Sequence, residues 1–311
     1  MDDAIRKAGV LIEALSYIRQ FRDKLTVIKV GGSYMEDDAA LTDTLQDIVF
    51  METVGMRPIV VHGGGKAISR AMEAAGLAPR FVQGRRYTDE ATLEIVARVL
   101  VDEINDDIVR RIEQLGGRAA VLHHQTTQCL FGRQTFLTTP AGERVDLGRV
   151  GEVTRVDTRL VERLCTAGVV PVVPCLAIDE SFGRGPAEPR NLLNVNADTA
   201  AAAVACQLRT EKLVVLTDTS GIWLDRNDAS SRAASLTVTQ CHDLIARGVI
   251  DAGMIPKVEA CLACLAVGVP KTHIIDGRLR HSLLLEIYTD QGVGTEIVTD
   301  AANRPVSARV H

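Results

Sequence analysis

The feature that most constrains the fold is the regular alternation of short apolar runs with longer helical patterns. The runs are rich in Val, Ile and Leu and occupy residues 25–30, 58–61, 119–122, 169–173, 212–217, 271–275 and 296–298. Helical patterns lie near residues 37–54, 65–77, 88–116, 155–168, 196–208, 237–248, 254–268 and 280–287. This alternation predicts an α/β fold, a three-layer αβα sandwich around one mainly parallel open sheet. Ligands of such sheets bind at the carboxyl ends of the strands, so functional residues are expected directly after the runs.

Composition agrees with such a sheet and excludes several classes of protein. Only 4% of the 311 residues are aromatic, so the core has to be built from aliphatic side chains, as in parallel sheets. The formal net charge of -5 argues against nucleic acid or anionic membranes as partners. The sequence has no apolar run long enough to span a membrane and no signal-peptide pattern at its start. We therefore expect a cytoplasmic protein that binds neither nucleic acid nor membrane.

The seven cysteines are scattered and do not form a disulfide framework. Cys261 and Cys264 make a C-x-x-C inside a helical pattern, where buried core thiols are favoured over a redox or zinc site. A structural zinc site would need a second pair of ligands, and none is apparent. No metal site is predicted from the sequence.

Three segments outside the alternation indicate the domain organisation. Residues 1–24 carry an amphipathic pattern, which predicts an N-terminal extension helix that either packs on its own domain or docks on another subunit. Residues 130–154 are predicted to form hairpins and loops, because they contain several glycines. Residues 179–193 have the Gly-, Pro- and charge-rich composition of a connector between lobes. We expect one lobe over residues 25–185 and another over residues 186–311.

Two glycine clusters end the first two strands. Lys29 is followed by Gly31 and Gly32, and the second strand ends in the segment 62–65, His-Gly-Gly-Gly, before a helical pattern. Glycines let the backbone approach a ligand, and N–H groups at a helix N-terminus attract anions. The clusters predict a phosphate or carboxylate site, although neither a P-loop nor a dinucleotide-binding motif is present. His62 could be catalytic, but a structural hydrogen-bonding role is favoured.

Polar residues follow the later elements as well. One of Arg85 and Arg86 could hold a carboxylate, while the other suits a surface ion pair. Asn196 suits a helix N-cap, a role that leaves the neighbouring Asn194 and Asp198 unexplained. The helix dipole disfavours a cation in a first turn, so Lys257 is predicted to neutralise an anion.

Six motifs in order resemble the amino acid kinase family, over about residues 10–298. They are Lys29-x-Gly-Gly, His62-Gly-Gly-Gly, Gly84-x-Arg86-x-Thr-Asp, Asn194-x-Asn-Ala-Asp198, Thr217-Asp-x-x-Gly221 and Gly253-Met-x-x-Lys257. The resemblance is closest to the members that phosphorylate N-acetyl-L-glutamate. It implies the amino acid kinase fold and an ATP- and Mg²⁺-dependent phosphorylation of the γ-carboxylate, a step of arginine biosynthesis.

The resemblance also implies a role for each matched residue. Lys29 and Lys257 are expected to stabilise the transition state, and Asp198 to orient both lysines. The implied substrate-binding residues are Gly64, Gly65, Arg86 and Asn194. The implied nucleotide-binding residues are Gly31, Gly32, Thr217, Asp218 and Gly221. On this basis the first lobe binds the acid and dimerises, and the second binds ATP.

The ends of the chain resemble the arginine-inhibited members of the family. In those, the N-terminal helix interlaces dimers into a hexamer, a trimer of dimers, and arginine binds between that helix and the C-terminal segment. The resemblance implies an effector site at Tyr17, His281, Glu286 and Gly294. By analogy, a PII-type signalling protein is a further candidate partner.

Three segments depart from the family pattern, namely residues 123–134, 179–193 and 219–220. They leave two alternatives open. One is a related kinase acting on aspartate, glutamate or an aminoadipate derivative. The other is a catalytically weak arginine-binding sensor, although the retention of Lys29, Lys257 and Asp198 argues against it.

Overall fold

The predicted sheet is present and has eight strands, in the order β12-β14-β13-β11-β1-β2-β8-β5. The computed structural model describes residues 2–138, 142–182, 191–225, 227–288 and 292–301. The strands of this sheet are β1 (Leu25–Val30), β2 (Arg57–His62), β5 (Ala119–Val121), β8 (Val170–Pro174), β11 (Lys212–Thr217), β12 (Ser235–Thr237), β13 (Lys271–Asp276) and β14 (Thr295–Val298). Neighbouring strands are parallel, except that β14 runs antiparallel to β13. The mainly parallel sheet is therefore confirmed.

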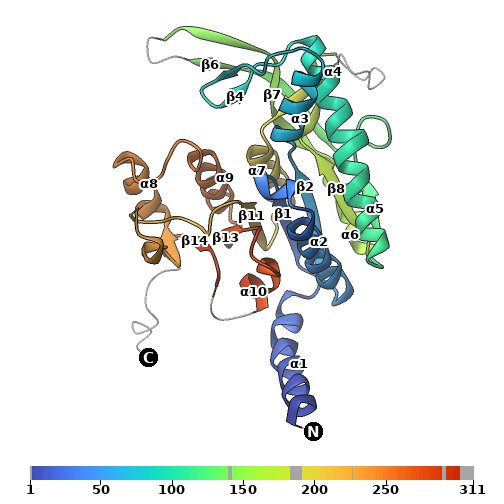
Figure 1. The fold of residues 1–311 in the computed structure, drawn as a ribbon, viewed down its shortest axis with the longest axis vertical. Coiled ribbons are helices and arrows are strands. Elements are labelled where there is room, and N and C mark those ends of the chain that lie inside the picture. Colours follow the sequence, from blue (N-terminus) through green and yellow to red (C-terminus); the bar gives the residue numbers. More distant parts are fainter. Residues whose placement is uncertain (1, 139–141, 183–190, 226, 289–291, 302–311) are drawn as a thin grey trace.

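Helices cover both faces of the sheet. On β1, Val27 faces one apolar cluster, while Ile28 and Val30 face the other. The first cluster is completed by α3 (Gly65–Ala74), α4 (Glu90–Arg98), α6 (Thr158–Thr166), α7 (Ala197–Leu208), α8 (Val238–Ala246) and α9 (Ile255–Ala266). The second is completed by α2 (Asp38–Thr53), α5 (Asp106–Gln114) and α10 (Ser282–Tyr288). This arrangement confirms the three-layer sandwich (Figure 1).

A second, smaller sheet lies beside the main one. The strands β6 (Leu130–Thr138), β7 (Arg144–Val156), β9 (Leu176–Asp179) and β10 (Leu192–Val195) form a closed barrel. The antiparallel pairing of β6 with β7 confirms the hairpin predicted over residues 130–154. Residues 179–193 are not a connector throughout, because Leu192 and Leu193 are fully buried and pair with β9. The lobe boundary predicted between residues 185 and 186 lies outside the described residues.

The helix predicted over residues 88–116 has a more complex form. Helices α4 and α5 are joined by a π-helical segment, Val99–Asn105, so the three pieces form one continuous rod. Before it, β3 (Phe81–Val82) and β4 (Arg85–Arg86) form a short antiparallel ribbon. The sequence predicted neither the π-helical segment nor this ribbon.

The N-terminal extension helix, α1 (Asp2–Phe21), projects away from the rest of the chain (Figure 1). Its end is anchored, since Lys212 Nζ lies 4.5 Å from the centre of the Phe21 ring. Toward the N-terminus of the helix, Ile5, Leu11 and Ile12 have 62–71% of their surface exposed. The apolar side chains of the N-terminal part of α1 are therefore not packed on its own domain, whereas Tyr17 and Phe21 are. Within the described ranges, every helix is too short or too polar to cross a membrane.

Cys261 and Cys264 are buried on α9, as the core-thiol interpretation predicts. Burial raises the pKa of the Cys261 thiol to about 12, which keeps it protonated and unreactive. Cys264 Sγ lies 3.5 Å from the Sγ of Cys206 on α7, so the two helices pack closely there.

Candidate active site

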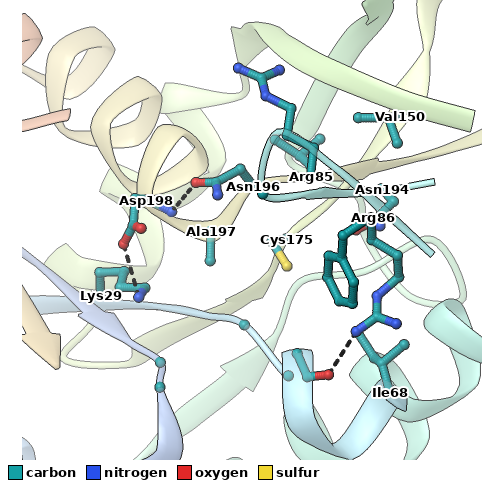
Figure 2. Close-up of a pocket in the computed structure, with 18 residues that line it drawn as sticks. Lys29, Ile68, Arg85, Arg86, Val150, Cys175, Asn194, Asn196, Ala197 and Asp198 are labelled. Carbon is teal, nitrogen blue, oxygen red and sulfur yellow. Dashed lines mark hydrogen bonds and ion pairs between the residues drawn. The ribbon is translucent and has the colours of Figure 1, made fainter. Parts of the chain in front are cut away.

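The two glycine clusters and the motif of residues 194–198 meet at one cavity, at the carboxyl ends of β1 and β2 (Figure 2). The cavity has a volume of about 220 Å³. Lys29 and Asp198 line one side of it, and Arg86 and Asn194 line the other. Apolar side chains, those of Ile68, Phe81 and Val150, complete the wall.

Asp198 is the centre of an ionic cluster at this cavity. Its Oδ1 lies 2.9 Å from Lys29 Nζ, and its Oδ2 lies 3.3 Å from Lys257 Nζ. Burial alone would raise the pKa of Asp198, but the two ammonium groups hold it below its ordinary value. The carboxylate is therefore ionised and holds two cations from different elements, β1 and α9, at one point.

Local sequence explains why these three groups meet. Asn196 caps α7, accepting hydrogen bonds at its Oδ1 from the backbone N of Asp198 and of Thr199, at 2.9 and 3.1 Å. The N-cap prediction is thus confirmed, and it places Asp198 in a first turn, where the helix dipole favours a carboxylate. Gly31 leaves room for the other partner, because a Cβ there would lie 2.6 Å from Lys29 Nζ.

Arg86 is fixed on the opposite side of the cavity. Its Nη2 donates hydrogen bonds to Gly65 O and to Ser69 Oγ, each at 2.8 Å, and its guanidinium lies 4.7 Å from the centre of the Phe81 ring. Arg86 is buried, whereas Arg85 is half-buried and also lines the cavity. A fixed, buried guanidinium is suited to hold a carboxylate of a bound acid.

The glycine triplet and Asn194 complete this side. Gly64 is the N-cap of α3 and Gly65 its first residue, so the first turn of the helix borders the cavity. Backbone N–H groups of a first turn lack partners within the helix and can bind an anion. Asn194, at the end of β10, donates from Nδ2 to Thr88 Oγ1 at 3.0 Å.

The residues predicted to bind nucleotide lie at the ends of β1 and β11. A Cβ on Gly32 would come within 3.9 Å of the Asp218 backbone N, so the two strand ends adjoin. Ser33 Oγ donates to Asp218 Oδ2 at 2.5 Å, a bond that lowers the pKa of Asp218 below its ordinary value. Thr217 precedes Asp218 and is buried at the end of β11.

A second cavity, of about 230 Å³, adjoins the turn after β11. Gly221, which the resemblance assigns to the nucleotide, lines it, and so do three residues that the sequence analysis did not single out, Trp223, Ile250 and Met254. Trp223 Nε1 donates to Ser220 Oγ at 3.0 Å, which orients the indole. Trp223 is the only tryptophan of the chain and follows the polar turn, a signal that could have identified it.

The four residues predicted to bind arginine lie on and around α10. Tyr17 of α1 packs edge-on against Tyr288, with 6.4 Å between ring centroids. His281 precedes α10, and its Nδ1 lies 2.7 Å from Asp47 Oδ1. The carboxylate of Glu286 is buried, contacts His273 Nδ1 at 2.7 Å, and accepts a hydrogen bond from the Gly294 backbone N at 3.0 Å.

His62 has no direct place in the cavity. It is fully buried, and its Nε2 contacts Asn105 Nδ2 at 2.9 Å. Burial lowers the pKa of His62 to about 4, which keeps the imidazole neutral at pH 7. These contacts agree with the structural role favoured from the sequence.

Known proteins resemble this chain over nearly its whole length. The model of the amino acid kinase family matches residues 24–276. Acetylglutamate kinase of Methanococcus vannielii is 44% identical over 301 residues, which cover 96% of this chain and 100% of that protein. Acetylglutamate kinase of Symbiobacterium thermophilum is 46% identical over 297 residues, 95% of this chain and 98% of that protein.

Solved structures share the fold. N-acetylglutamate synthase from Neisseria gonorrhoeae, complexed with coenzyme A and N-acetyl-glutamate, has a TM-score of 0.80 and 24% identity. The match covers 94% of this chain and 63% of that chain. Carbamate kinase from Giardia lamblia bound to AMP-PNP has a TM-score of 0.61 and 14% identity, over 89% of this chain and 99% of that one.

Proposed function

The chain belongs to the amino acid kinase family, and we propose that it transfers the γ-phosphoryl group of ATP to the γ-carboxylate of N-acetyl-L-glutamate, a step of arginine biosynthesis. The observation that carries the proposal is the Lys29–Asp198–Lys257 cluster beside a cavity that also holds a buried arginine. The curated relatives described above, at 44% and 46% identity, support the choice of substrate.

The proposed reaction needs positioning and charge neutralisation rather than a general base. A side-chain carboxylate of the Glu type has a pKa near 4.3, so the nucleophile is already ionised at pH 7. Phosphoryl transfer spreads negative charge over the transferred group, and fixed cations stabilise it. Lys29 and Lys257 supply these cations in our proposal, and Asp198 keeps both ammonium groups in place before the substrates bind.

We assign the acid substrate to the side of the cavity formed by residues 25–185 and by Asn194. Arg86 holds the α-carboxylate, and Gly64 and Gly65 offer backbone N–H groups. The apolar wall at Ile68 and Val150 suits a small acyl group.

We assign ATP to residues 186–311, together with Gly31 and Gly32. Thr217 and Asp218 lie at the end of β11, beside Gly32. Gly221 lines the cavity at Trp223, which has the apolar and aromatic lining that suits a nucleobase. The same part of the chain would therefore hold both the phosphates and the base.

Mg²⁺ fits this site as an ion that is held mainly by the phosphates of ATP. Across the described residues, no group of three or more His, Cys, Asp or Glu side chains is arranged to bind a metal. Asp198 is occupied by two lysines, whereas Asp218, beside Gly32, is a carboxylate that could contact the ion. Mg²⁺ commonly takes one or two carboxylates and completes its coordination with phosphate oxygens and water. When bound, the ion neutralises phosphate charge.

The test is an ADP-release assay on the purified chain with N-acetyl-L-glutamate, L-glutamate, L-aspartate and N-acetyl-L-aminoadipate. Trapping with hydroxylamine identifies an acyl phosphate product. We expect N-acetyl-L-glutamate to have the highest kcat/KM, and turnover to require Mg²⁺. A preference for another of these acids would indicate a related kinase instead, and no turnover on any of them would indicate a sensor.

We further propose that arginine inhibits the enzyme by binding near α10, and that the chain forms a hexamer through α1. Support comes from the clustering of Tyr17, His281, Glu286 and Gly294 around α10 and from the exposed apolar side chains in the N-terminal part of α1. Calorimetry with arginine and light scattering of the purified protein test the two parts separately. If the titration with arginine produces no heat and the enzyme's activity is the same with and without arginine, the proposed inhibition is refuted.

A further inference from the structure

Thr88 is fully buried and contacts both residues whose side chains are proposed to hold the acid substrate, Arg86 and Asn194. Its Oγ1 donates to the backbone O of Arg86 at 3.1 Å. The same Oγ1 accepts a hydrogen bond from Asn194 Nδ2 at 3.0 Å. One hydroxyl thus joins β4, which carries Arg86, to β10, which carries Asn194.

This chain of hydrogen bonds can run in only one direction. A carbonyl oxygen only accepts, so the single proton of the Thr88 hydroxyl has to point to Arg86 O. The hydroxyl oxygen can then only accept, and Asn194 has to turn its NH₂ group toward it. Thr88 therefore fixes which atoms of the Asn194 amide face the cavity, namely Oδ1 and the second N–H.

The main chain of Thr88 is held as firmly as its hydroxyl. Its N–H donates to Leu147 O at 3.0 Å, and its C=O accepts from the Arg149 N–H at 2.6 Å. Both partners flank Gly148, which has a φ of 71° and where an added Cβ would collide with Thr88 O. Strand β7 can approach Thr88 this closely only because residue 148 is glycine. The backbone that carries the Thr88 hydroxyl is therefore held in one position.

We propose that Thr88 is a positioning residue that selects N-acylated acidic amino acids by locking the amide of Asn194 relative to Arg86. The proposal rests on the function proposed above and identifies a residue that determines which substrate the enzyme prefers. An acylated α-amino group is neutral and offers one N–H donor and one carbonyl acceptor, which suit a fixed amide O and N–H. A free α-ammonium group instead brings a positive charge close to the Arg86 guanidinium.

The experiment compares Thr88→Val, which removes the hydroxyl at nearly constant shape, with Thr88→Ser, which keeps it. Thr88→Ala is measured in parallel, in case the buried valine prevents folding. We expect Thr88→Val to raise the KM for N-acetyl-L-glutamate about 10-fold and to reduce the preference for it over L-glutamate by a similar factor. The KM for ATP should stay within about twofold, and Thr88→Ser should restore wild-type values within about threefold. These factors correspond to the loss of one hydrogen bond.

Two controls separate positioning from a merely structural role. Thr92→Val removes another buried threonine hydroxyl, in the first turn of α4, and should leave both KM values unchanged. In the Asn194→Ala background, Thr88→Val should have little further effect on the KM of the acid, because it acts through Asn194. Equal effects in both backgrounds, or a Thr88→Val enzyme that loses only thermal stability, would overturn the proposal.

The wild-type measurement distinguishes failure of this proposal from failure of the proposed function. A wild-type enzyme that neither binds nor phosphorylates N-acetyl-L-glutamate overturns the proposed function, and this inference with it. A wild-type enzyme that does both, with Thr88→Val unchanged in its KM and in its preference, overturns the role of Thr88 alone.

Discussion

Replacement of Asp198 by asparagine tests the ionic cluster most directly. The carboxylate oxygens lie 2.9 Å from Lys29 Nζ and 3.3 Å from Lys257 Nζ. At an effective dielectric constant of about 20, these contacts are worth about 6 and about 5 kcal/mol before desolvation is subtracted. The substituted asparagine would keep the shape and lose the charge, so the two ammonium groups would repel each other.

The net effect on stability is smaller than these Coulomb energies. Lys29 and Asp198 have side chains only 5% and 6% exposed, so much of the attraction offsets the cost of removing both charges from water. Removal of one partner of a buried pair costs about 3–5 kcal/mol. We expect Asp198→Asn to lower the free energy of unfolding by about 3 kcal/mol and kcat by at least about 100-fold. The folded fraction remains large if the protein has an ordinary stability of about 5–15 kcal/mol.

The assay combines urea unfolding with the ADP-release assay at saturating substrates. Asp47→Asn is the matched control, since Asp47 is buried and bonded to His281 but does not line the active-site cavity. The control should keep kcat within about threefold. An Asp198→Asn enzyme with kcat within about fivefold of wild type would show that Asp198 does not hold the lysines for catalysis.

Three other parts of the chain give further predictions. ADP should change the emission of Trp223, the only tryptophan, and Trp223→Ala should raise the KM for ATP about 10-fold while Trp223→Phe raises it less. Burial raises the pKa of Asp47 to about 6 from an ordinary value of 3.8, against the opposing hydrogen bond from His281. The folded state therefore binds more protons than the unfolded state between these pH values, and this group's contribution to stability falls by about 3 kcal/mol as the pH rises from about 4 to about 6. Urea unfolding should show that the stability of Asp47→Asn lacks this dependence on pH. If the free energies of unfolding of variant and wild type differ by the same amount at every pH, the raised pKa of Asp47 is refuted. Deletion of residues 1–21 should reduce the mass seen by light scattering, and an unchanged mass would exclude α1 from assembly.

Much of the fold could be predicted because its main strands have a clear local pattern. The runs that became β1, β2 and β11 are apolar, β-branched and followed directly by polar or glycine-rich turns. The short strands have no such pattern. The ribbon strand of Arg85 and Arg86 has two charged residues, and it is fixed by its pairing with Phe81 and Val82 and by the tertiary contacts of Arg86. Leu192–Val195 follows a Gly- and Pro-rich segment, and its pairing with β9 and β7 makes it a strand.

The residues of the candidate site were named from the sequence, but most of the contacts among them were not. The resemblance implied that Asp198 orients Lys29 and Lys257, and the structure adds that each of its two carboxylate oxygens contacts one of the two lysines. Trp223 was missed because its role depends on which loops enclose it, and sequence spacing does not contain that information. The internal bonds of Glu286 to His273 and Gly294 are likewise set by packing around α10.

The charge of the cavity resolves an apparent conflict with the acidic composition. The chain has a formal net charge of -5, yet the proposed ligands are carboxylates and phosphates. The cavity is lined by three cations, Lys29, Arg85 and Arg86, against the single carboxylate of Asp198, a formal balance of +2. Lys257 adds a further cation through its contact with Asp198. Because buried charges are screened far less than surface charges, this local balance outweighs the net charge for any ligand that enters the cavity. The acidic surface then disfavours polyanions, while the cavity selects small ones.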